Sequence, residues 1–480
     1  MFLLEEKEAI EAISDWLREE YKCSLEEAKW KAELIFHQYS RLRNTGGLEE
    51  AKLKHLEENN NGLEVFKGAI GHYEEYKAFH EKIDFDDMMM KLKALFIERP
   101  EVLASYQERF QYILVDEFQD INSVQYELLI RLAARYRNLF VVGDDDQSIY
   151  GFRGSSPRFL LRFSKDFSET KRVDLTVNFR CADAIIRASS ELIRHNRIRF
   201  LKDLKGSGSG KRGSCILEAH TTSEGQASWI SREIRKQEGS CAVLCRTKKE
   251  FKDITKALAD HGIFYLCQEL EGMPSQIEQI MRSYILWALD KGSKEDIEIV
   301  YKASGMNMAP DLAGNRDPDR VIKQREMEHV RNKIRHMDPL HAIRYIWYMG
   351  GVREYMMRQQ EKEGMRWSDV TRQFKVLKEE ACLFQNLQDW IQRKSDPGLP
   401  KVRVMTMHGA KGLEFDTVFI PNLNEGFCPH ERSTGEDAIE EERRVLYVAM
   451  TRPRKRLYLS YIKEQASKRK PSRFLDDFSI

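Results

Sequence analysis

Hydrophobic residues recur with a helical period over the first part of the chain. Between residues 1 and 80, apolar side chains stand three or four positions apart among many Glu and Lys residues, as at Ala9, Ile13, Trp16 and Leu17. This spacing gathers apolar side chains on one face of a helix. Residues 1–80 are therefore predicted to form a helical packing module, with a loop at the polar stretch 57–62.

Short continuous apolar runs replace this period further along. They occupy residues 112–115 and 139–142, and a third run at 172–175 (RVDL) alternates apolar with charged residues. Each run leads into polar residues. Short apolar runs separated by helical stretches are typical of a parallel sheet, whose chemistry lies at the carboxyl ends of the strands. The Gly-, Ser- and Lys-rich residues 205–214 predict a surface loop.

The same alternation returns in the second half of the chain. Residues 240–245 form a further apolar run, whereas residues 275–398 are charged, helical in their spacing and without strand runs. Apolar runs at 402–406, 417–421 and 457–461 then predict strands again. A helical block between two strand-rich blocks predicts an insertion into one α/β domain.

Composition and charge add one constraint. The 480 residues are enough for roughly two to four domains, and 78 Lys and Arg against 77 Asp and Glu leave a net charge of +1. Without a global basic field, a nucleic acid would have to meet a local basic patch. The run Arg194, Arg197, Arg199 and Lys202 is a candidate for phosphate contact, and the alternative is a set of solvated surface charges.

Cysteine usage and run lengths bear on location. The eight cysteines form no C-x-x-C pair, so we interpret them as reduced thiols rather than as ligands of a metal or an iron–sulfur cluster. No apolar run reaches the ~18 residues of a membrane helix, and the N-terminus turns acidic at Glu5 and Glu6, unlike a signal peptide. We therefore expect a cytoplasmic protein with no membrane partner.

An acidic pair follows the first apolar run, where residues 114–120 read LVDEFQD. A strand that delivers Asp116 and Glu117 into solvent places one carboxylate to hold Mg²⁺ and a second to activate water for attack on a γ-phosphate. Taken alone, such a pair is more often a cap for the next helix.

The next strand end is crowded with polar and aromatic residues, since residues 142–154 read VGDDDQSIYGFRG. Its glycines let backbone approach a ligand closely, and Gln147 is suited to orient a water or to sense a phosphate. Tyr150 and Phe152 are suited to stack on nucleobases. The alternative is that both rings belong to the core.

With these segments in hand, a family resemblance is evident. They resemble the second and third motifs of UvrD/Rep/PcrA-type superfamily 1 DNA helicases. Residues 83–88 (IDFDDM) resemble the acidic segment of that family, and residues 175–180 (LTVNFR) its fourth motif. Residues 406–415 (TMHGAKGLEF) are similar to the fifth motif and residues 441–452 (EERRVLYVAMTR) to the sixth. The resemblance extends over residues 83–475.

The resemblance implies an α/β fold with two RecA-like motor domains of the P-loop NTPase type, each carrying a helical insertion. The implied parts are the insertion of the first motor domain (1–80), the remainder of an incomplete first domain (81–175), the first part of the second domain (176–274), its helical insertion (275–398) and its second part (399–480).

Catalytic roles follow from the resemblance residue by residue. Asp116 is implied to hold Mg²⁺ and Glu117 to act as general base. Gln147 is implied to couple the γ-phosphate to the DNA site. Arg180 and Arg452 are implied to reach the γ-phosphate from the second motor domain, where a fixed positive charge suits the developing negative charge.

The same resemblance places the adenosine and the DNA. Phe179 stands where the family usually has Tyr and is implied to stack on adenine, and Glu414 is implied to accept hydrogen bonds from the ribose. On the DNA side, Phe152 takes the place of a stacking Trp. Tyr150, Arg153 and His408 are implied neighbours of the strand, although His408 is alternatively a residue that holds a loop.

One expected element is absent from the sequence. A motor of this type needs G-x-x-x-x-G-K-[ST] after a strand, because backbone N–H groups and one Lys cradle the phosphates of ATP. The nearest match, residues 206–212, has Arg after its Lys, no first Gly and no preceding strand run. In the family this loop precedes the helical module, within which the chain starts at Met1. A missing N-terminus is the simpler interpretation, and a relative that has lost ATP hydrolysis is the alternative.

The resemblance thus predicts a 3′→5′ DNA helicase or translocase that uses ATP and Mg²⁺. Its implied partners are single-stranded DNA, single-strand/duplex junctions and repair or replication proteins. Because the phosphate-binding loop is absent from the sequence, its ATP hydrolysis is predicted to be impaired. The alternative is a non-hydrolysing DNA-binding or partner-docking remnant. A helicase–nuclease would need a further domain after Ile480.

Overall fold

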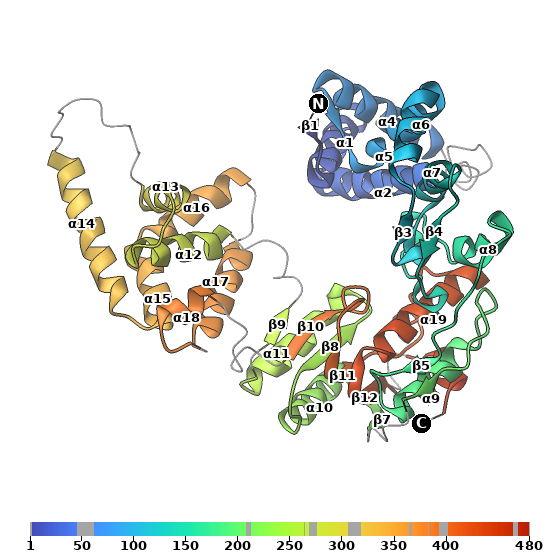
Figure 1. Ribbon diagram of the computed structural model, residues 1–480. Coiled ribbons are helices and arrows are strands. Elements are labelled where there is room, and N and C mark those ends of the chain that lie inside the picture. The colour runs from blue at the N-terminus through green and yellow to red at the C-terminus, as the bar shows by residue number, and fades with distance from the viewer. Residues whose placement is uncertain are drawn as a thin grey trace.

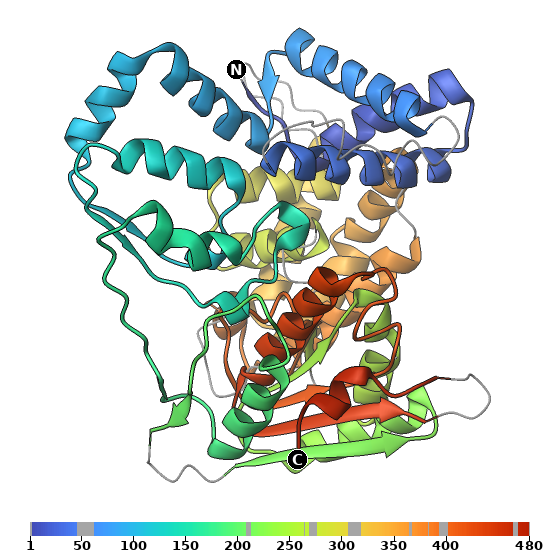
Figure 2. The same ribbon diagram turned by 90° about the vertical axis from the view of Figure 1, so that its right-hand side faces the viewer.

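The computed structural model describes residues 2–45, 62–207, 213–263, 265–267, 276–305, 318–363, 367–382, 384–392, 402–463 and 469–479. A helical module lies at one end of the molecule and a parallel sheet at the other, with a second helical block to the side (Figures 1 and 2). The predicted loop at 57–62 lies outside the described residues except for Gly62, which begins a helix. None of the described helices is long and apolar enough to cross a membrane.

The predicted helical module is confirmed for the described residues before 80. It consists of α1 (Glu6–Tyr21), α2 (Leu25–Asn44) and α4 (Gly62–Phe79), and their inward faces share one apolar core. Strand β1 (Phe2–Leu3) pairs in parallel with β2 (Lys82–Ile83) beside this core.

The acidic segment 83–88 has a structural role in this module. Helix α5 (Phe85–Glu98) begins with a capping box. The side chain of Asp84 accepts a hydrogen bond from the backbone N–H of Asp87, and the side chain of Asp87 accepts one from the backbone N–H of Asp84. Arg43 and Lys77 neutralise the two carboxylates, and all four residues are buried. A buried carboxylate is stable only when it is paired and hydrogen-bonded, so this network ties α2 and α4 to the start of α5.

Two short parallel strands carry the first acidic motifs. Strand β3 (Ile113–Val115) pairs with β4 (Leu139–Val141), as the apolar runs predict. One face of this pair packs on α7 (Ser123–Ala133) and α8 (Arg158–Asp166). The other face leaves Leu114 and Phe140 with 74% and 63% of their surface exposed. Helix α6 (Pro100–Arg109) precedes β3 and contacts α5 and α7.

The predicted strand at 172–175 is wrong. These residues are irregular, and a two-residue strand β5 (Val177–Asn178) follows them and pairs with β6 (Lys205–Gly206). Val173 and Leu175 are 73% and 85% exposed, so no described neighbour covers the apolar run. The predicted loop 205–214 overlaps β6, and its residues 208–212 lie outside the described part.

The main sheet contains six parallel strands in the order β7-β12-β11-β8-β10-β9. Their bounds are β7 (Ser214–His220), β8 (Cys241–Cys245), β9 (Tyr265–Cys267), β10 (Val402–Thr406), β11 (Phe415–Ile420) and β12 (Pro453–Ile462). Every residue of β8 is buried, as expected for a central parallel strand covered on both faces. Helices α9 (Asp183–Ile193) and α19 (Glu436–Met450) cover one face, and α10 (Ser223–Arg235) and α11 (Phe251–Asp260) cover the other.

A helical block is inserted between two neighbouring strands of this sheet. The chain leaves β9, forms the block and returns as β10, which pairs with β9. The block comprises α12 (Gln276–Ala288), α13 (Lys294–Ser304), α14 (Pro318–Arg335), α15 (Pro339–Met349), α16 (Val352–Glu363), α17 (Trp367–Ala381) and α18 (Leu387–Gln392). It has its own apolar core around Tyr284, Trp347 and Trp390. The described helices between residues 276 and 392 thus lie between two paired strands of one sheet, in the region where the sequence predicts an insertion.

Candidate functional site

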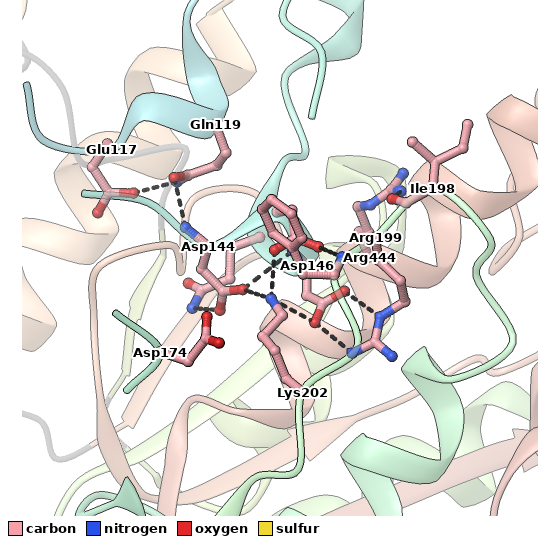
Figure 3. A network of polar contacts seen from close by, with 12 residues as sticks. Glu117, Gln119, Asp144, Asp146, Asp174, Ile198, Arg199, Lys202 and Arg444 are labelled. Carbon is pink, nitrogen blue, oxygen red and sulfur yellow. Dashed lines mark hydrogen bonds and ion pairs between the residues drawn. The ribbon is translucent and has the colours of Figure 1, made fainter. Parts of the chain in front are cut away.

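The end of β3 presents the acidic pair to solvent. Asp116 and Glu117 are exposed, and Glu117 adopts φ +50°, which turns the chain sharply after the strand. Buried Gln119 donates from Nε2 to Glu117 Oε2 at 2.5 Å and accepts at Oε1 from Asp144 N at 3.0 Å. Gln119, which the sequence analysis did not single out, thus orients Glu117 and joins the ends of β3 and β4 (Figure 3).

Three aspartates after β4 are neutralised by two cations from the segment that follows α9. Lys202 Nζ lies 2.5 Å, 2.6 Å and 2.9 Å from carboxylate oxygens of Asp144, Asp145 and Asp146 (Figure 3). Arg199 binds both oxygens of Asp146, at 2.8 Å and 2.7 Å. Burial tends to raise the pKa of Asp144, but Lys202 and Gln147 outweigh it and lower the pKa overall. Burial raises the pKa of Asp145.

The predicted basic run is therefore divided. The side chains of Arg199 and Lys202 are only 5% and 14% exposed and face aspartates, so they are not available to DNA phosphates. Arg197 is exposed and pairs with Glu436, and Arg194 is exposed. The sequence alone did not reveal this division, because the aspartates lie more than fifty positions earlier in the chain.

Gln147 and Arg452, each of which is predicted to act at the γ-phosphate, are in contact. Gln147 donates from Nε2 to Asp144 Oδ2 at 2.8 Å and accepts at Oε1 from Arg452 Nη2 at 3.3 Å. Arg452 is buried and donates from Nε to the Val448 carbonyl at 2.8 Å. Burial, reinforced by the charge of Arg180, lowers the pKa of Arg452 to about 10, so this guanidinium stays charged at neutral pH.

The remaining residues predicted on the nucleotide side lie close together in space. Arg180 donates from Nε to Glu414 Oε2 at 2.8 Å, and Arg454 binds the other oxygen of Glu414. The Glu414 carboxylate is thus held by two arginines, and its side chain remains 36% exposed. Phe179, next to Arg180, exposes 72% of its surface, as an adenine-stacking ring would before binding.

Lys411 is a second residue that the sequence analysis missed. Its Nζ pairs with Asp120, lies 2.9 Å from the Gln147 carbonyl oxygen and lies 3.9 Å from Glu117 Oε2. Its side chain is only 8% exposed. Lys411 therefore brings a cation from the loop after β10 to the acidic end of β3. Its place inside the segment 406–415 was the signal that could have identified it.

The four residues predicted to contact DNA form one group. The rings of Tyr150 and Phe152 have centroids 5.9 Å apart, and those of Phe152 and His408 are 6.1 Å apart. The Arg153 guanidinium lies 5.3 Å and 5.4 Å from the centroids of Tyr150 and Phe152. Phe152 remains 54% exposed. Burial, reinforced by Arg246, lowers the pKa of His408 to about 4, so its ring is neutral at neutral pH.

Within the described residues, no group of three or more His, Cys, Asp or Glu side chains is arranged to hold a metal ion. Asp116 and Glu117 remain the exposed carboxylates at the end of β3.

Comparison with known proteins assigns the chain to a family. Residues 1–168 match the model of the UvrD/REP helicase N-terminal domain, and residues 173–275 and 330–464 match the UvrD-like helicase C-terminal domain.

Individual relatives agree with this assignment. The chain is 33% identical over 434 residues to YjcD of Bacillus subtilis, covering 81% of this chain and 56% of that protein. It is 29% identical over 521 residues to DNA helicase II of Rickettsia typhi, covering 95% and 77%. It is 31% identical over 472 residues to the ATP-dependent DNA helicase PcrA of Staphylococcus epidermidis, covering 86% and 63%. The chain, which spans between about half and three quarters of these relatives, belongs to the UvrD/Rep family of DNA helicases.

Proposed function

We propose that the chain is the ATP-dependent motor part of a 3′→5′ DNA helicase with two RecA-like domains, the first of them incomplete. Its partners would be single-stranded DNA, single-strand/duplex junctions and repair or replication proteins in the cytoplasm. The direction of movement is carried over from the family resemblance. The names of the relatives, which include DNA helicase II and PcrA, support the class of activity.

One observation carries this proposal. The segment between Gly143 and Gly154 holds Gln147 against Arg452 at one end and presents Phe152 beside His408 at the other. Gln147 and Phe152 thus belong to one short, continuous piece of chain. A shift of Gln147 on nucleotide binding would move the stacking ring, which is the coupling that a translocating motor requires.

The residues at the end of β3 suit the metal and water chemistry of ATP hydrolysis. Mg²⁺ prefers carboxylate oxygens, and the exposed carboxylate of Asp116 supplies them. Mg²⁺, when bound, would neutralise charge on the phosphate oxygens. Glu117 would take a proton from the attacking water, with Gln119 holding one of its oxygens. Arg180, which follows β5, and Arg452, which follows α19, would supply positive charge.

We also propose that this chain by itself hydrolyses ATP slowly. Its sequence has no G-x-x-x-x-G-K-[ST] segment, and positioning and charge neutralisation make up most of phosphoryl-transfer catalysis. A non-hydrolysing DNA-binding remnant is the second candidate. The assembled group of Tyr150, Phe152, Arg153 and His408 favours it, because this group does not depend on the phosphate-binding loop.

The DNA side is tested by binding of fluorescent oligo-dT, measured by anisotropy. Phe152→Ala should lose one stacked base, worth ~1–3 kcal/mol, and bind roughly 5- to 150-fold more weakly. Phe79→Ala is the matched control, because Phe79 is 84% exposed in the helical module. Wild-type affinity in Phe152→Ala would contradict the DNA assignment.

The ATP side is tested by turnover with and without oligo-dT. The wild-type chain and Glu117→Gln should both remain at background while retaining DNA binding. Strand-stimulated turnover that disappears in Glu117→Gln would show that another segment cradles the phosphates, and it would exclude the non-hydrolysing candidate.

A further inference from the structure

A cavity of about 340 Å³ lies where the end of α2, the loop after β4 and the start of α19 meet. Gly151 and Gly154 line it, and these two residues flank the stacking ring of Phe152 in the chain. The cavity therefore lies against the same loop that presents Phe152. Its polar wall includes Arg41, Ser155 and Arg444.

Two hydrogen-bond donors in this wall lack partners. Ser155 Oγ and Arg444 Nε are buried and bond to no described atom, in residues that are 8% and 3% exposed. The far end of the Arg444 side chain is held, because Nη2 donates to the Ile198 carbonyl at 2.7 Å. Leaving a buried donor without a partner costs ~1–3 kcal/mol, so the site favours an acceptor. Arg41 pairs with no carboxylate among the described residues.

Three helices begin at the cavity. Ser123 is the first residue of α7, Arg158 is the first of α8, and Asp437 lies in the first turn of α19, and all three line the wall. The N-terminus of α7 is capped by Asn122, and Ser156 Oγ accepts from Arg158 N at 3.3 Å at the start of α8, whereas α19 has no side-chain cap. Helix N-termini carry partial positive charge and unpaired N–H groups, which favour anions.

The acidic residues of the wall are already engaged. Glu441 Oε1 accepts from Gly151 N at 2.8 Å, and burial raises the pKa of Glu441, which favours its neutral form. Asp437 pairs with Arg158 at 3.0 Å. The donors of Arg41, Ser155 and Arg444 are therefore the ones left for a ligand.

We propose that this cavity binds a phosphate group of the DNA strand whose base stacks on Phe152. The inference rests on the proposed DNA binding and adds a specific subsite to it. An anion there would satisfy Ser155 Oγ and Arg444 Nε, face Arg41 and lie near the uncapped N-terminus of α19. The phosphate would thereby hold the strand in register with the stacking ring and brace the loop against α19.

The test measures oligo-dT affinity between 50 and 200 mM NaCl. Each phosphate contact with a single strand contributes a slope of about 0.7 to the dependence of log affinity on log salt. When the salt concentration rises fourfold, the affinity of wild type should therefore fall by a factor about 2.6 times larger than the factor by which the affinity of Arg41→Gln falls. Ser155→Ala should weaken binding without changing protein charge. Arg18→Gln, an exposed charge-matched control on α1, should keep the wild-type slope.

The remaining outcomes separate this inference from the proposed function. Phe152→Ala should weaken binding at every salt concentration with an unchanged slope. The phosphate subsite would be overturned if Arg41→Gln kept the wild-type slope and Ser155→Ala kept the wild-type affinity. If Phe152→Ala still bound weakly in that case, the proposed DNA binding would remain intact. A third outcome is that inorganic phosphate raises the melting temperature of wild type but not of Arg41→Gln, while neither Arg41→Gln nor Ser155→Ala changes the affinity for DNA. This outcome would assign the cavity to a free anion instead.

Discussion

Lys202 connects the segment after α9 to the end of β4 more closely than any sequence pattern indicates. Its ammonium group contacts three carboxylates at 2.5 Å, 2.6 Å and 2.9 Å, and two of them belong to Asp145 and Asp146, which are 2% and 0% exposed. Together the carboxylates raise the pKa of Lys202 despite its burial. Lys202→Met would keep the aliphatic stem and remove only the charge.

The size of the effect follows from burial. Removing one partner of a buried ion pair costs ~3–5 kcal/mol. Arg199 continues to hold Asp146 through two hydrogen bonds, and the side chain of Asp144 is 33% exposed to water. The expected cost of Lys202→Met therefore lies at the lower end, about 3 kcal/mol. This corresponds to about 150-fold more frequent opening of the contact.

Hydrogen exchange read out by mass spectrometry measures this opening locally, so it does not require the whole chain to unfold in one step. Peptides that contain Asp144–Asp146 and residues 199–205 should exchange about 100-fold faster in Lys202→Met, while α12 is unaffected. Lys205→Met is the control, because Lys205 is 72% exposed and, among the residues that the structure describes, its ion pair is with exposed Asp203. Exchange within threefold of wild type in Lys202→Met would refute the reasoning.

Three further perturbations test other parts of the structure. The folded chain keeps His408 neutral down to about pH 4, whereas the unfolded chain protonates it near 6.5. The unfolding free energy should therefore fall by about 3 kcal/mol between pH 6.5 and 4. In urea titrations His408→Asn should lack this part of the loss, and a pH dependence identical to that of wild type would contradict the prediction. Lys411→Met leaves the partly buried Asp120 without its cation and should cost about 2–4 kcal/mol, seen as a lower melting temperature. An unchanged melting curve would argue against the pairing. Phe140 is 63% exposed, so Phe140→Asp should change the unfolding free energy by less than about 0.5 kcal/mol. The same substitution should reduce binding of the dye ANS to this apolar surface. Dye binding equal to that of wild type would mean that the face with Leu114 and Phe140 is covered.

The sequence by itself determined the local elements and the order of the chemistry. The three-to-four-residue period predicted α1, α2 and α4, and the apolar run at 240–245 predicted β8, which is buried throughout. These patterns are readable because the period of helix or strand is set by neighbouring residues along the chain. The motifs also placed Asp116 and Glu117 at a strand end, where the structure has them.

Only the tertiary structure decided which charges are paired and which face solvent. Arg199 and Lys202 resemble a solvated basic run in the sequence, yet they are buried against aspartates more than fifty positions away. Lys411 reaches Asp120 across nearly three hundred positions. The apolar run at 172–175 did not become a strand, because no described neighbour covers it. Burial and ion pairing depend on distances between remote segments, and a local pattern carries no information about those distances.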